Sequence, residues 1–96
     1  MKVYSILATT RVDEPGDTIS WTECDCLATA STKEKALELI SRYADWFMSK
    51  VPELMEVRRE HDGWFIDLKG NVEGTGIEYN LYAIETELDY FDTREL

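Results

Sequence analysis

The chain has 96 residues, of which 44% are hydrophobic, and this size and composition fit one globular domain and exclude two. Twenty acidic residues against ten basic ones give a formal net charge of -10. Phosphate backbones and anionic lipids repel such a surface, so we expect no direct binding to nucleic acid or to membranes. A protein partner with a basic surface is the expected alternative, although acidity can also serve solubility alone.

The sequence predicts a cytoplasmic protein without a cofactor or a metal. No apolar run approaches the roughly 18–20 residues of a membrane span. The N-terminal segment Met1–Ala8 is too short for a signal peptide. Cys24 and Cys26 would lie about 6.6 Å apart on a strand, at the upper end of the disulfide range. We therefore expect reduced thiols, and a zinc site would need further ligands that a chain with one histidine, His61, does not offer.

The first third of the chain predicts a hairpin over residues 2–30. Residues 3–12 are rich in β-branched and aromatic residues and are apolar on both sides, which is typical of an interior strand. Pro15 and Gly16 suit the central positions of a type II turn. The second strand, residues 19–29, has one side of small residues against which we expect a helix to pack: Thr22, Cys24, Cys26 and Ala28.

One long helix is predicted over residues 32–51. Ser31 to Glu34 match a capping box, and Pro52 bounds the other end. Apolar residues recur between them at spacings of three and four. They are Ala36, Leu37, Ile40, Tyr43, Ala44, Phe47, Met48 and Val51. Leu39 and Trp46 lie on one flank of this apolar stripe.

The remainder predicts a three-stranded meander over residues 54–88, followed by an acidic tail, residues 89–96. Alternating segments surround a tight turn at His61–Gly63, and a glycine-rich loop spans residues 70–76. In the last strand, residues 77–88, the apolar side changes midway. That change indicates a β-bulge or burial of both faces.

These elements predict a single α+β domain, residues 1–96, in the order ββαβββ. We expect an antiparallel five-stranded sheet of order 2-1-5-4-3, with 2-1-3-4-5 as the alternative, packed on one face by the single helix. Five strands make a sheet about 24 Å wide, whereas a helix is only about 10–12 Å across. Either the sheet curls on itself or another molecule covers side chains such as Trp64 and Tyr82.

No motif in the chain predicts catalysis. The sequence contains no nucleophile elbow, no zinc-protease motif and no phosphate-binding loop, and its single histidine lies in a predicted turn. We therefore do not expect an enzyme.

Two kinds of side chain are candidates for binding a partner. Rows of carboxylates on strands can imitate a phosphate backbone, although charged strand residues also discourage aggregation. The acidic candidates are Glu23, Asp25, Glu85, Glu87 and Asp89. Trp46, beside Leu39, is a candidate anchor unless other residues of the chain cover this flank.

The sequence thus predicts a small acidic protein-binding module that engages a basic surface of a nucleic-acid-handling partner. Short acidic α+β chains without active-site motifs are common among inhibitors made by phages and mobile elements, which is an analogy of class only. The alternative is a homodimeric domain with a scaffolding or small-ligand-binding role. In that case Trp64 and Tyr82 on the uncovered sheet face would carry the function.

Overall fold

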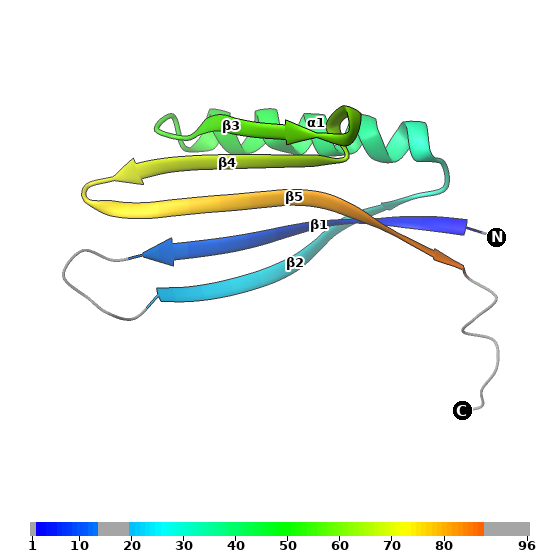
Figure 1. Cartoon of the computed structure of the whole chain (residues 1–96), viewed down its shortest axis with the longest axis horizontal. Helices are drawn as coiled ribbons and strands as arrows, with labels where there is room; N and C mark the ends of the chain where they lie inside the picture. The colour runs from blue at the N-terminus through cyan, green and yellow to red at the C-terminus, as the bar shows by residue number, and fades with distance from the viewer. Residues whose placement is uncertain (1, 14–19, 88–96) are drawn as a thin grey trace, which may run out of the picture.

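The computed structural model describes residues 2–13 and 20–87, with the side chains of residues 20 and 21 left out, and it has the predicted α+β architecture (Figure 1). The strands form one antiparallel sheet of order β2-β1-β5-β4-β3, which confirms the predicted topology. The elements are β1 (Lys2–Asp13), β2 (Ser20–Ala30), α1 (Lys33–Lys50), β3 (Met55–Glu60), a 3-10 turn (His61–Gly63), β4 (Phe65–Val72) and β5 (Thr75–Glu87).

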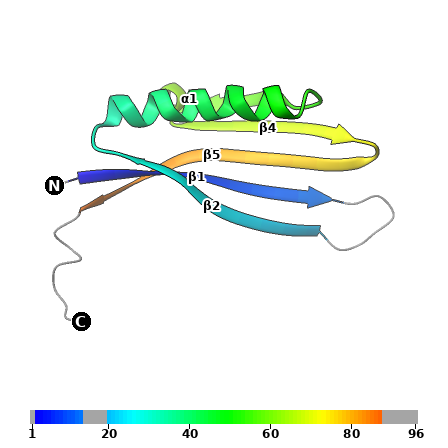
Figure 2. The ribbon, with the colours of Figure 1, turned by 180° about the vertical axis from the view of Figure 1, so that it is seen from behind.

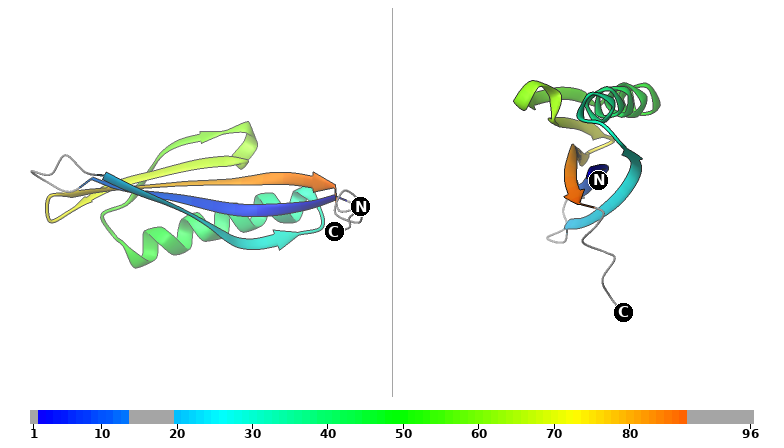
Figure 3. Two further views of the ribbon diagram at one scale, coloured as in Figure 1. Left: turned by 90° about the horizontal axis from the view of Figure 1, so that it is seen from below. Right: turned by 90° about the vertical axis from the view of Figure 1, so that its right-hand side faces the viewer.

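The helix α1 lies against one face of the sheet, and no second described helix covers the other (Figure 3). Its buried residues are Ala36, Ile40 and Ala44, which confirms the centre of the predicted apolar stripe. They share a core with inward side chains of four strands. The buried sheet residues of this core are Tyr4, Ile6, Ala8, Ala30, Ile66, Leu68, Leu81 and Ala83.

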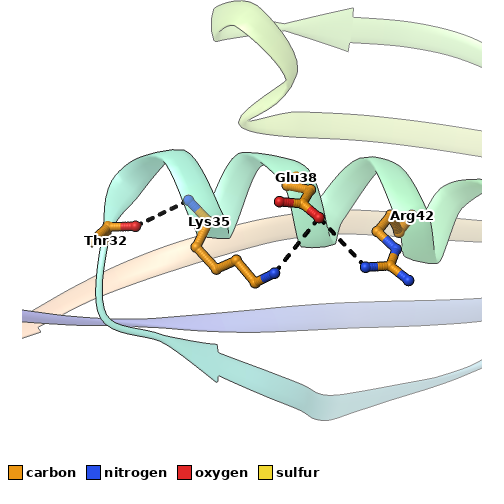
Figure 4. A network of polar contacts seen from close by, with 4 residues as sticks. All are labelled: Thr32, Lys35, Glu38 and Arg42. Atoms are coloured by element: carbon orange, nitrogen blue, oxygen red, sulfur yellow. Dashed lines mark hydrogen bonds and ion pairs between the residues drawn. The ribbon is translucent and has the colours of Figure 1, made fainter.

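Both ends of α1 lie within one residue of their predicted positions. Thr32, one residue after the expected Ser31, caps the helix by accepting a hydrogen bond from the backbone N–H of Lys35 at 3.1 Å (Figure 4). Glu38 then pairs with Lys35 and Arg42 on the exposed side of the helix. At the other end Val51 turns to an extended conformation before Pro52, as the steric demand of proline requires.

A β-bulge in β2 overturns the expected packing side of this strand. Ile6 pairs with Ala28, but Leu7 pairs with Cys26, so Leu27 is an extra residue in the ladder. Beyond the bulge the alternation is reversed. The small residues Thr22, Cys24 and Cys26 therefore face away from α1, and the prediction that the helix packs on them is wrong.

In β5 no bulge is found, because its register with both neighbours runs without a shift. Burial of both faces, the other expected explanation, is not found either, because Ile84 is 46% exposed on the face away from α1. The loop expected over residues 70–76 is mostly strand, with a two-residue turn at Glu73 and Gly74. Both turn residues have positive φ, 52° and 89°, as the hairpin turn of type I′ requires. The predicted hairpin tip at Pro15 and the acidic tail lie outside the described residues.

Candidate protein-binding surfaces

Glu23 and Asp25 lie on the side of the sheet that faces α1. Asp25 pairs across the ladder with Ala8, which is only 2% exposed beneath the helix, and Glu23 pairs with Thr10. Direct partners in an antiparallel ladder share a face. Both carboxylates are exposed, and neither forms an ion pair with a described residue. Their negative charge is therefore open to a partner.

A groove of about 430 Å³ separates α1 from β2. Figure 2 shows β2 leading into the start of α1 and diverging from the helix toward its own first residue. The hydroxyl of Tyr43 donates to the backbone oxygen of Leu27 at 3.2 Å and ties helix and strand together. The groove lining is mainly apolar and consists of Leu27, Leu39, Arg42, Tyr43, Trp46 and Phe47.

Trp46 is the most exposed aromatic residue of this lining, with 51% of its surface accessible. Its ring meets the ring of Phe47 edge to face, with the centroids 5.1 Å apart. The ammonium group of Lys50 lies 5.7 Å from the Trp46 centroid. Phe47 in turn stacks on Tyr79 of β5. The indole of Trp46 is thus held from one side and open on another, whereas its neighbour on this flank, Leu39, is partly buried against the core.

The acidic pair continues from this groove along β2. Asp25 precedes Leu27 by two residues, about 6–7 Å along a strand. Arg42, the cation of the lining, is already engaged by Glu38 at 3.4 Å. The groove wall that carries Trp46 and the acidic rim formed by Glu23 and Asp25 therefore lie on the same side of the sheet.

The other predicted acidic row does not share this surface. Glu85 forms an ion pair with Lys2, with Nζ and Oε2 3.2 Å apart, and hydrogen bonding and charge from Glu85 raise the pKa of Lys2. Glu87 lies opposite Lys2 in the ladder, and Asp89 lies outside the described residues. This end of β5 consequently presents a partly neutralised row.

Trp64 and Tyr82 have different positions. Trp64 packs edge to face on Tyr4 with centroids 5.8 Å apart, at the helix side of the sheet, and Lys33 lies over its ring. It is therefore not one of the uncovered aromatics. Tyr82 does lie on the uncovered face, where its hydroxyl is 3.2 Å from Oγ1 of Thr9. Its neighbour across the ladder there is Phe65.

A carboxyl cluster on the uncovered face was not recognised from the sequence. Asn80 Nδ2 donates to Oδ1 of Asp67 at 2.8 Å and to Oε2 of Glu78 at 3.3 Å. Burial, followed by the hydrogen bond with Glu78, raises the pKa of Asp67 to about 6. Burial also acts on Glu78, but hydrogen bonds from Asp67 and Asn80 outweigh it and lower the pKa of Glu78. The two carboxyl groups therefore share a proton in mildly acidic solution.

Comparison with known proteins does not suggest a function for this chain. No protein-family model matches it, and no curated protein and no solved structure is significantly similar to it. No helix among the described residues is long and apolar enough to cross a membrane. Those residues also contain no group of three or more metal-binding side chains, and Cys24 and Cys26 are free and exposed.

Proposed function

We propose that this chain is a small acidic protein-binding module that holds a basic, amphipathic segment of a partner protein in the groove between α1 and β2. One observation carries the proposal. An apolar groove with a half-exposed Trp46 adjoins two carboxylates, Glu23 and Asp25, that no described cation neutralises. Apolar side chains of the segment would contact Trp46 and Leu39, and its lysines or arginines would reach the acidic rim.

The two parts of this surface contribute differently to binding. Tryptophan is enriched among the residues whose truncation costs most affinity, because a large rigid ring excludes water at low entropic cost. Exposed carboxylates mainly steer the encounter, and the resulting rate enhancement falls as salt rises. We therefore assign affinity chiefly to Trp46, and the association rate and charge preference to Glu23 and Asp25.

The class of partner follows from the chemistry of the segment. Lysine- and arginine-rich segments are the usual electrostatic footprint of proteins that bind nucleic acids. A module that occupies such a segment competes with the phosphate backbone for it. We therefore propose that the partner handles nucleic acids and that binding inhibits it, in the manner of the acidic inhibitors made by phages and mobile elements.

Panning a random-peptide display library against the full chain tests this function without knowledge of the partner. We expect the selected peptides to combine lysine or arginine with aliphatic or aromatic residues. Synthetic copies should bind Trp46→Ala at least tenfold more weakly in calorimetry, about 1.4 kcal/mol. The double variant Glu23→Lys/Asp25→Lys should bind more weakly at low salt and show a flatter dependence on salt.

A matched control separates local from general electrostatics. Glu34→Lys/Glu73→Lys makes the same change of charge at two other exposed carboxylates, in the first turn of α1 and in the β4–β5 turn. If this control weakens binding as much as the variant at Glu23 and Asp25, the acidic rim has no specific role. Selected peptides without basic residues, or full affinity in Trp46→Ala, would contradict the proposal.

A further inference from the structure

The face of the sheet opposite α1 has an apolar part that no described element covers. Ile84 is 46% exposed there. One cross-strand row runs from Leu7 through Tyr82 to Phe65, because these residues are paired in the ladders of β1, β5 and β4. Ile84 adjoins this row along β5. Together the four residues form the apolar strip of the uncovered face.

The uncovered face is nearly neutral, in contrast to the chain as a whole. The strand pairing puts three cationic residues on the uncovered face, Arg11, Arg58 and Lys69. Each of them lies beside a carboxylate on the same face. Those carboxylates are Asp13, Glu60, Asp67 and Glu78. Two of the cations have near partners within the face, Arg11 with Asp13 and Arg58 with Glu60, each at 3.4 Å. Two copies of a chain with a charge of -10 repel each other least across such a face.

The uncovered face is also large enough for a specific contact. Five strands give a width of about 24 Å, and four cross-strand rows at about 6.6 Å give a length of about 26 Å. Covering such a face buries about 600 Å² on each copy, or about 1,200 Å² in total. That total is at the lower limit for specific protein interfaces.

We infer that a second copy of this chain covers the uncovered face, so that two sheets pack face to face with the apolar strips at the centre. The contact is isologous, because the same patch is used twice. It leaves the groove between α1 and β2 of each copy open, since that groove lies on the other side of the sheet. The inference is independent of the proposed function.

Sedimentation equilibrium of the full chain from about 1 to about 200 μM tests the contact, because a dimer responds to concentration by mass action. We expect a monomer–dimer equilibrium in this range. Ile84→Lys places two charges in the centre of the contact and should weaken the dimer at least tenfold. Val57→Lys is the comparison variant: Val57 is also β-branched and 48% exposed, but it lies in the edge strand β3, at the margin of the covered area. It should weaken the dimer much less than Ile84→Lys does.

Alkylation of the two free thiols gives a second readout that needs no substitution. Cys26 pairs with Leu7 and Cys24 with Thr9, so both thiols belong to the uncovered face. Their alkylation should slow severalfold as the chain is concentrated into the dimer range. A monomer at every concentration would overturn the inference, as would a dimer that Ile84→Lys leaves intact and Trp46→Ala breaks. Neither result affects peptide binding in the groove. The dimer can therefore be disproved without disproving the proposed function, and the reverse also holds.

Discussion

The ring of Phe47 in α1 stacks on the ring of Tyr79 in β5, with centroids 4.5 Å apart and planes inclined by 26°. The stack fixes the second half of the helix on the sheet and supports the edge of Trp46. We expect Phe47→Ala to lower the free energy of unfolding by about 3 kcal/mol, because it removes a large packed ring. Trp46→Ala should cost less than about 1 kcal/mol, since half of its surface is exposed. Urea unfolding followed by circular dichroism measures both.

Comparison of Trp46→Ala with Phe47→Ala distinguishes an effect on folding stability from an effect on binding. If the proposed function holds, Trp46→Ala loses peptide affinity while keeping stability, whereas Phe47→Ala loses stability first. Equal losses of stability in the two variants would show that Trp46 belongs to the core. Loss of binding in Trp46→Ala would then say nothing about a surface anchor.

The start of α1 depends on one side-chain hydrogen bond. Oγ1 of Thr32 accepts from the N–H of Lys35, and this satisfies one of the N–H groups that a helix leaves without a partner at its start. Thr32→Ala should lower the free energy of unfolding by about 1 kcal/mol. Ser31→Ala should change it by less than about 0.5 kcal/mol, because Ser31 is exposed and precedes the cap. The same urea titration checks both variants. A larger decrease in the free energy of unfolding for Ser31→Ala than for Thr32→Ala would indicate that Ser31 caps the helix, as the sequence predicted.

The strand order and the helix were predictable because each followed from a repeating pattern. Ala36, Ile40 and Ala44 recur at helical spacing, and the strands that became interior, β1 and β5, are apolar on both faces. The side of β2 that meets the helix was not predictable. The small residues alternate without interruption from Thr22 to Ala28, and nothing in that alternation marks Leu27 as the extra residue of a bulge.

The sequence identified individual residues of the candidate surfaces, but it did not predict which of them lie together in the fold. Trp46 and the pair Glu23 and Asp25 were identified separately, and the bulge at Leu27 brought them to one side of the molecule. Asp67 lies between Ile66 and Leu68 in an alternating segment, and nothing in that pattern marks it as buried. Its burial and its shared proton arise from Glu78 and Asn80, which belong to the neighbouring strand and are more than ten residues away along the chain.

Gly70 lies where the chain passes close to the loop after α1. A Cβ atom at this position would be 2.5 Å from the backbone oxygen of Glu53, and backbone cannot give way as a flexible side chain can. We expect Gly70→Ala to lower the free energy of unfolding by about 2–3 kcal/mol. Gly76→Ala is the matched control, since its Cβ would meet nothing closer than 3.9 Å, and it should change stability by less than about 1 kcal/mol. Thermal unfolding compares the two variants. Equal midpoint temperatures would mean that the backbone at Glu53 moves away from the added Cβ without loss of stability.

The proton shared by Asp67 and Glu78 makes the stability of the fold depend on pH. The pKa of Asp67 is about 6 in the folded chain and about 4 when unfolded. The folded state therefore binds this proton more tightly. The stability that it contributes is fully present below pH of about 4 and is lost as pH rises through about 6. Glu78 acts in the opposite sense at lower pH, because its pKa is lowered.

Asp67→Asn replaces the ionising group by a neutral one of the same shape that can still donate to Glu78. At pH 8 this variant should be more stable than the natural chain by about 1–2 kcal/mol, and the advantage should vanish near pH 4.5. Urea unfolding at the two pH values measures the difference. Asp25→Asn, the same substitution at an exposed strand residue, serves as the control for the substitution itself. Lower stability of Asp67→Asn at pH 8 would show instead that Arg58 and Lys69 stabilise an ionised Asp67.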